Sequence, residues 1–276
     1  MKKLLTLAVA ATFSLSLFAA DIFTYAPITG SVKSYTETDF SIASRFGTLY
    51  RTPSTKITHA FDENGKEITS SELTPKDAVI NTISSTYDTA GNLAEQVCTS
   101  ADGEIVWKNT FAYKSGLKVD SSEYDRKGNL RARTIFTYDN NLLSDESSYD
   151  GEGALIWKTI YKYDDNNRIA SVNEYNPDGT LSEKETYTYT ESGAIDTIIK
   201  TDAYTAKENQ LVFRYGANGV LNEITTYDSA KQVLKRTLLK YDDKGNVNKV
   251  SVYDVAEKFG TTVNELVEMS EYSYEY

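Results

Sequence analysis

The chain has 276 residues, of which 29 are Lys or Arg and 40 are Asp or Glu, giving a net charge of −11. A chain this acidic repels nucleic acid and anionic lipid surfaces, so we expect no nucleic-acid partner. Tyr occurs 21 times and Pro four times, a composition that favours strands over helices.

Residues 1–20 have the pattern of a bacterial signal peptide. Two lysines precede an apolar run that ends at Phe18, and two alanines come before Asp21. The run is too short to span a bilayer comfortably. We therefore expect cleavage after Ala20, export to the periplasm or cell surface, and a mature chain that does not span the membrane. A retained N-terminal anchor is the alternative.

An aromatic ladder runs through nearly all of the remaining chain. Its rungs stand 25 or 26 residues apart, at Tyr35, Phe61, Tyr87, Tyr113, Tyr138, Tyr163, Tyr189, Tyr215 and Tyr241. A second ladder lies between these rungs, at Tyr124, Tyr149, Tyr175, Tyr227 and Tyr253. Repetition at a fixed period indicates a tandem supersecondary unit. We expect a single repeat domain over residues 21–276.

Each unit reads as a β-hairpin. In Tyr124-Asp-Arg-Lys-Gly-Asn-Leu130, the Asp can accept backbone hydrogen bonds, and the Gly three residues later tolerates a positive φ. A type I turn followed by such a Gly joins antiparallel strands. Between turns, apolar residues alternate with polar ones, as in Leu155, Trp157, Thr159, Tyr161 and Tyr163. This period of two is typical of strands with one better-buried face.

The repeat predicts an all-β fold: one large, curled antiparallel β-meander of about 16–18 strands, built from tandem hairpin repeats of about 26 residues. The Tyr and Leu rows should face inward. Whether so wide a sheet curls, splits or closes is left open by the pattern. We expect residues 21–34 to cover the first edge. Residues 255–267 read as an insertion in the last repeat, with the one helix-like period in the chain.

The runs Tyr124-Asp-Arg-Lys-Gly-Asn-Leu130 and Tyr161-Lys-Tyr-Asp-Asp-Asn-Asn-Arg-Ile169 resemble the YD repeat of Rhs-like bacterial secreted and surface proteins. The resemblance extends from about Phe61 to Tyr253 and implies sheets that wind into shells. Some YD arrays are associated with carbohydrate binding, and others enclose a toxic domain. This array is short and usually lacks the Arg before the turn, and we expect no toxin-like C-terminal domain after it. We therefore do not expect it to enclose cargo.

No catalytic or cofactor motif stands out. His59 is the single His and Cys98 the single Cys, so there is no internal disulfide and no Cys/His metal spacing. We expect His59 to be an exposed strand residue and Cys98 a small strand residue. The acidic pairs Asp164–Asp165 and Asp242–Asp243 fall in turns and are expected to be solvated. We predict no cofactor, no metal and no enzymatic activity.

The best candidates for a binding site are aromatic. Trp107 and Trp157 each stand six residues before a ladder Tyr, with the parity of the Tyr face. Flat aromatic rings suit stacking against sugars, which gives a candidate binding face of Trp107, Trp157, Tyr113, Tyr163, Tyr138 and Tyr189. Core filling is the alternative role for the two Trp residues.

We expect a non-enzymatic binding or scaffold module of the bacterial cell envelope, with a glycan or an envelope protein as partner. An outer-membrane β-barrel is the alternative, because strand number and strand length permit it. The run Leu181–Tyr189 opposes that alternative, since Glu183, Lys184 and Glu185 place charges on both faces. A glycan-active enzyme is a second alternative that would need two facing carboxylates.

Overall fold

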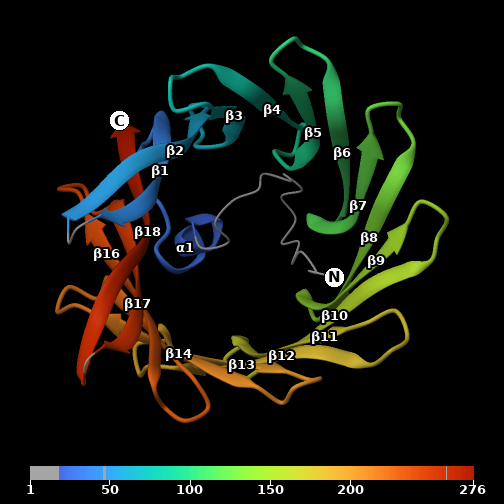
Figure 1. Ribbon diagram of the computed structural model, residues 1–276. Helices are drawn as coiled ribbons and strands as arrows, with labels where there is room; N and C mark the ends of the chain where they lie inside the picture. The colour runs from blue at the N-terminus through green and yellow to red at the C-terminus, as the bar shows by residue number, and fades with distance from the viewer. Residues whose placement is uncertain (1–18, 46–47, 259) are drawn as a thin grey trace.

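A computed structural model describes residues 19–45, 48–258 and 260–276, and within them it forms one 18-stranded antiparallel sheet. Strands follow each other in chain order, and β1 pairs with both β2 and β18. The sheet is therefore a closed barrel, as the ring in Figure 1 shows. The predicted meander and strand number are confirmed, and closure is the outcome that the sequence left open.

The strands vary from 7 to 15 residues. The helix α1 spans Ala19–Tyr25, and the strands are β1 Ser34–Arg45, β2 Thr48–Phe61, β3 Glu67–Leu73, β4 Val79–Tyr87, β5 Leu93–Ser100, β6 Ile105–Lys114, β7 Leu117–Asp125, β8 Leu130–Asp139, β9 Leu142–Asp150, β10 Leu155–Tyr163, β11 Ile169–Tyr175, β12 Leu181–Tyr189, β13 Ile195–Asp202, β14 Glu208–Tyr215, β15 Leu221–Tyr227, β16 Val233–Tyr241, β17 Val247–Lys258 and β18 Thr261–Glu275.

The predicted Asp-to-Gly turns join these strands. Between β7 and β8, Oδ1 of Asp125 accepts hydrogen bonds from the backbone N–H groups of Lys127 and Asn129, at 2.8 and 2.9 Å. Gly128 follows with φ at 82°, a conformation that costs an L-residue energy but not Gly. Six further aspartates hold their turns with the same pair of bonds: Asp62, Asp88, Asp150, Asp164, Asp228 and Asp242.

The ladder aromatics face the inside of the barrel. Tyr35, Tyr215 and Tyr241 pack in one cluster with Ile22 of α1, and α1 lies within the ring in Figure 1. Directly opposite residues on neighbouring strands share a face. The inner face therefore continues from Tyr35 through His59, Ser70, Ile83 and Cys98 to Trp107. The predicted inward direction is confirmed for the first ladder. It was wrong for the second ladder, because Tyr124, Tyr149 and Tyr253 lie opposite Lys108, Arg133 and Arg236 on the outer face.

The N-terminal segment covers an inner face rather than an edge, which corrects the expectation for residues 21–34. A closed ring has no free edge, so Ile22, Phe23 and Tyr25 of α1 pack against the wall instead. Phe23 packs against Tyr35 and Tyr272 at ring-centroid distances of 5.6 and 5.3 Å, and Tyr25 packs on Phe213 at 4.9 Å. A seven-residue helix is unstable alone, so this packing maintains it.

Asn246 fastens this segment to the wall. Its side-chain oxygen accepts a hydrogen bond from the Thr29 backbone N–H at 2.7 Å, and its Nδ2 donates to the Thr29 carbonyl at 3.0 Å. Nδ2 also lies 2.9 Å from the hydroxyl of Tyr276, which donates to Asp242 at 2.6 Å. One buried amide thus connects the segment after α1, the β16–β17 turn and the C-terminal residue.

Most of the expected signal peptide, residues 1–18, lies outside the described residues, and the predicted cleavage after Ala20 falls within α1. Within the described ranges, no helix has the length and apolar character needed to cross a bilayer.

The structure corrects the helix-like interpretation of residues 255–267. Residues Val255–Lys258 prolong β17, and Thr261–Val267 begin β18, so the last hairpin is longer than the others. Val255 lies opposite Asn264, and Ala256 opposite Val263. Pairing as two strands prevails over the helix-like spacing of apolar residues, because it satisfies the backbone hydrogen-bonding groups of both segments at once.

Candidate functional site

The inner surface divides into two walls of different chemistry. The helix-side wall, which we define as the inner face of β13–β18 and β1, is apolar where α1 packs against it, with Ile198, Phe213 and Val252 at its centre. The distal wall, which we define as the inner face of β4–β11, combines aromatic rings with amides and carboxylates. Because its polar groups face the interior, the distal wall is the candidate binding surface.

Three of the predicted site residues, Tyr138, Tyr163 and Tyr189, have a structural role at one end of the barrel. Each hydroxyl donates to a carbonyl 20 residues earlier, on Lys118, Leu143 and Ile169 respectively, at 2.7–2.9 Å. Tyr87, Tyr215 and Tyr241 repeat this bond. We call this set of bonds the tyrosine clasp. Each bond joins the end of the second strand of a hairpin to the start of the first strand of the same hairpin. The regular spacing of the ladder therefore has a structural cause.

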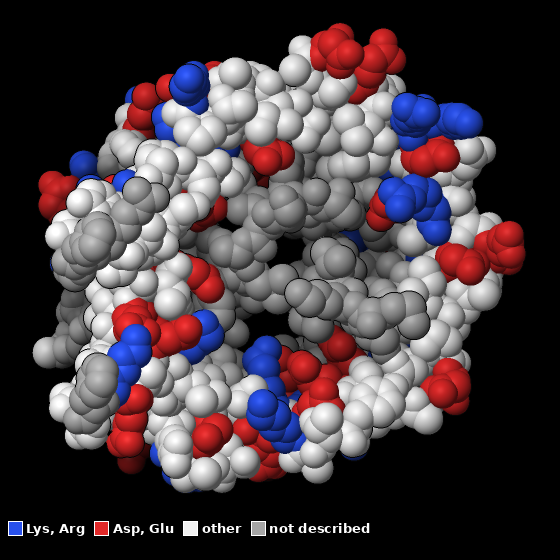
Figure 2. Space-filling model, viewed as in Figure 1, with Lys and Arg blue, Asp and Glu red and all other residues white. Residues whose placement is uncertain are grey.

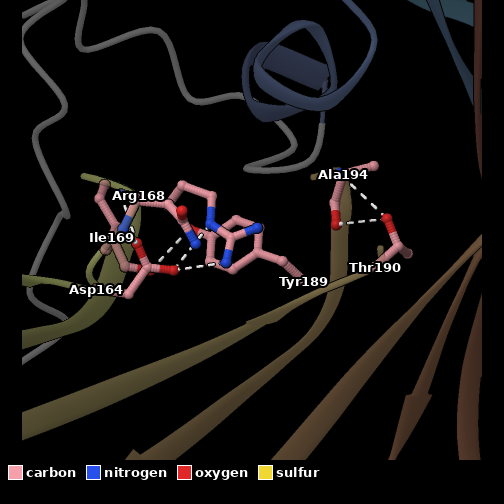
Figure 3. A network of polar contacts seen from close by, with 7 residues as sticks. Asp164, Arg168, Ile169, Tyr189, Thr190 and Ala194 are labelled. Atoms are coloured by element: carbon pink, nitrogen blue, oxygen red, sulfur yellow. Dashed lines mark hydrogen bonds and ion pairs between the residues drawn. The ribbon is translucent and has the colours of Figure 1, made fainter. Parts of the chain in front are cut away.

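Figure 3 shows one unit of the tyrosine clasp. The ring of Tyr189 lies beneath the Arg168 guanidinium, 4.2 Å from its carbon atom, while the hydroxyl donates to the Ile169 carbonyl. Asp164 accepts hydrogen bonds from the Arg168 backbone and side chain, and these contacts lower the pKa of its carboxyl group. Of the predicted acidic pairs, Asp164 and Asp242 are therefore engaged in their own turns.

The two Trp residues lie on the distal wall but do not form one platform. Trp107 is 6% exposed and clusters with Ile83 and Cys98, so core filling describes it well. Trp157, on β10 opposite Ser148, and Tyr113, at the end of β6, are half-buried. That the six aromatic residues bind a ligand stays a prediction.

The polar part of the distal wall was missed by the sequence reasoning. Glu146 lies opposite Phe136 on one side and Thr159 on the other, and Tyr161 donates a hydrogen bond to it at 3.1 Å. Burial raises the pKa of the Glu146 carboxyl group. Lys118 lies over the Phe136 ring at 4.1 Å, and burial lowers the pKa of its ammonium group. The only sequence signal for these residues was their parity, which places them on the inner face of their strands. In other respects they look like ordinary polar strand residues.

His59 and Cys98 are too far apart to act together. Their strands, β2 and β5, are three strand spacings apart, or about 14 Å. The expectation of an exposed His59 was wrong: the ring stacks on Tyr35 at 4.3 Å, and Nδ1 lies 2.5 Å from a Glu67 oxygen. Cys98 is 2% exposed, as a small residue inside the wall. Among the described residues, no group of three or more His, Cys, Asp or Glu side chains is placed to hold a metal ion.

No protein-family model matches this sequence, and no curated protein matches it. Solved structures do. A porin-like protein from Bacteroides uniformis is 12% identical, with 90% of this chain and 99% of that chain covered, at a TM-score of 0.51. The two proteins share a β-barrel fold.

Two further likenesses are weaker. A porin-like protein from Bacteroides vulgatus is 12% identical over 88% of this chain and 98% of that chain, at a TM-score of 0.38. The TcdB2-TccC3 structure is 12% identical over 79% of this chain and 16% of that chain, at a TM-score of 0.27. Scores this low support no inference about this chain.

Proposed function

We propose that the protein is a non-enzymatic binding or scaffold barrel of the bacterial cell envelope, exported to the periplasm or cell surface, whose outer wall remains in water. Its partner is a ligand or an envelope protein. The repeated runs from Tyr-Asp to Gly support kinship with YD-repeat proteins as part of the same proposal.

The outer wall carries the proposal. Several of its ion pairs lie in the middle of strands, which would place them near the midplane of a bilayer. They are Arg133 with Asp120, Lys158 with Asp145, and Arg236 with Glu223, at 2.5, 3.5 and 2.8 Å. Figure 2 shows charged side chains around much of the perimeter in that view. A Lys or Arg facing lipid at the midplane costs about 2–4 kcal/mol, so a wall with several of them favours water.

An outer-membrane barrel is the second candidate, and two observations favour it. The fold is shared with a porin-like protein. In addition, Val79, Ile80, Ile105 and Val106 are 39–47% exposed at the starts of β4 and β6. These aliphatic residues occupy strand ends, whereas a lipid-facing band continues across the middle of the strands.

Fractionation of cells that express the full chain tests the choice between the two. We expect the protein in the fraction released without detergent, with a cooperative thermal transition in plain buffer. Recovery in the membrane fraction, with detergent required to keep the barrel folded, would replace the proposal with the outer-membrane candidate.

The variant Ile135→Lys adds a charge to an outward position that is 38% exposed. It should leave a water-facing wall folded, whereas it should destabilise a lipid-facing one.

A further inference from the structure

Two amide side chains on the distal wall are buried with unsatisfied oxygens. Gln96 on β5 and Asn109 on β6 lie directly opposite each other and are 7% and 3% exposed. Neither side-chain oxygen has a hydrogen-bond partner among the described residues, although Nε2 of Gln96 donates to Ser85 at 3.3 Å. A buried acceptor without a partner loses its hydrogen bonds to water and gains none in return, so each such group destabilises the fold. Native folds rarely leave two of them side by side without a use for them.

A carboxylate extends this pair into a row of three acceptors. Glu123 on β7 lies directly opposite Asn109, so the row crosses three neighbouring strands over about 10 Å. One Glu123 oxygen lies 3.3 Å from the Arg131 guanidinium. On the far side of Glu123 stands Ala132, whose methyl group offers no polar contact. The row therefore offers oxygens and calls for a ligand that donates several hydrogen bonds.

Aromatic rings border the row on both sides. Trp107 and Phe111 stand two residues before and after Asn109 on β6, which places each about 7 Å away on the same face. Aromatic faces attract cations as well as apolar groups, and the attraction grows when water is excluded. Three oxygens between two aromatic residues form a suitable setting for an alkylammonium group.

The charge of the surroundings agrees with a cation. Glu146 and Glu174 lie on the same wall, both opposite Thr159. Lys118 interacts with Glu146, where burial raises the pKa of the carboxyl group and the Lys118 charge opposes that rise. The chain as a whole carries a net charge of −11. An excess of charge of one sign attracts ligands of the opposite sign.

We propose that Gln96, Asn109 and Glu123 bind a primary ammonium group, as carried by an aliphatic polyamine or a lysine side chain. This inference rests on the proposed binding function and specifies its ligand chemistry. The ammonium donates its three N–H groups to the two amide oxygens and the carboxylate, and its alkyl chain lies against Trp107 or Phe111.

Titration of the exported protein with spermidine, with trilysine and with neutral maltohexaose tests the proposal. The variant Trp157→Phe leaves Trp107 as the sole Trp, so its fluorescence reports on this wall. We expect a saturable change with one of the two amines and none with maltohexaose. Spermidine binding without trilysine binding indicates a small polyamine, and the reverse indicates a lysine-bearing peptide.

Matched variants separate the site from general attraction. Glu123→Gln keeps the shape and removes the charge, and we expect it to weaken amine binding at least tenfold. Asp120→Asn removes one charge from the outer face of the same strand, where Asp120 pairs with Arg133, and should change affinity less than twofold. Asn109→Leu should also weaken binding at least tenfold, with folding checked by circular dichroism.

Equal losses from Glu123→Gln and Asp120→Asn, or no binding of either amine, would overturn the inference. The proposed function is tested separately, because a protein that fractionates as a water-exposed barrel and ignores both amines loses the ammonium site alone.

Discussion

The two inner walls are built from the same repeat and yet differ in what they bury. On the helix-side wall, Phe213 and Leu239 pack against α1 and form a hydrocarbon core. On the distal wall, other inward positions of the repeat carry Asn109, Glu123 and Glu146 beside the aromatic rings. The tyrosine clasp and the Asp-held turns are common to both. The shared turns maintain the barrel, and the side chains between turns are free to differ, so one wall contributes stability and the other can contribute binding.

The largest expected difference in stability is between two aromatic residues that occupy the same position of the repeat on the two walls. Phe213→Ala should lower the free energy of unfolding by about 4 kcal/mol, because the ring is 3% exposed and contacts Tyr25. Phe111→Ala, at the same repeat position on the distal wall, should cost about half as much, since its ring is half-buried. Urea denaturation of both variants measures the difference, and equal losses would contradict the division into two walls.

A smaller effect is expected at the last residue of the turns. Asn246→Ala removes the three hydrogen bonds with Thr29 and leaves buried groups unpaired, which should cost about 3 kcal/mol. Asn129→Ala changes the same position in an exposed turn, where the amide donates a hydrogen bond to Asp125, and should cost less than about 1 kcal/mol. Limited proteolysis should cut the N-terminal segment faster in Asn246→Ala alone. Unchanged cleavage would show that the amide does not fasten this segment.

The pH dependence gives the smallest expected difference. Burial raises the pKa of Glu37 from 4.5 to about 8, and Asp39 adds to the rise while the hydrogen bond from Tyr272 opposes it. A carboxyl group with a raised folded-state pKa binds more protons in the folded protein than in the unfolded chain. Its contribution to stability is therefore present at low pH, declines between about pH 4.5 and 8, and is lost above that.

Glu37→Gln should remove this decline and stabilise the protein by about 2 kcal/mol at pH 9. Glu146→Gln on the distal wall should have the same sign and a smaller size, because that carboxyl group is less buried. Denaturation at pH 5, 7 and 9 measures both variants. A Glu37→Gln variant with the same pH profile as the parent protein would show that the carboxyl group titrates normally.

Several features of the fold were predictable because they depend on neighbouring residues. The Asp125-to-Gly128 turn is a local structure, fixed by one side-chain acceptor and one positive φ. The alternation from Leu155 to Tyr163 gives the strand and its inward face in the same way. The candidate site was predictable only in part: Trp107 and Trp157 were found by their spacing, whereas Gln96 and Asn109 carry no sequence signal, since nothing local distinguishes a satisfied amide from an unsatisfied one.

The sequence by itself determined the repeat, the turns, the strand order and the inward direction of the first aromatic ladder, because each depends on contacts within one hairpin. Tertiary structure alone decided that β1 meets β18, that residues 21–34 enter the barrel, and that residues 255–267 extend a hairpin. These outcomes depend on segments more than 200 residues apart in some cases, such as Thr29 and Asn246. Their energies arise only when the ring closes, so no local pattern could encode them.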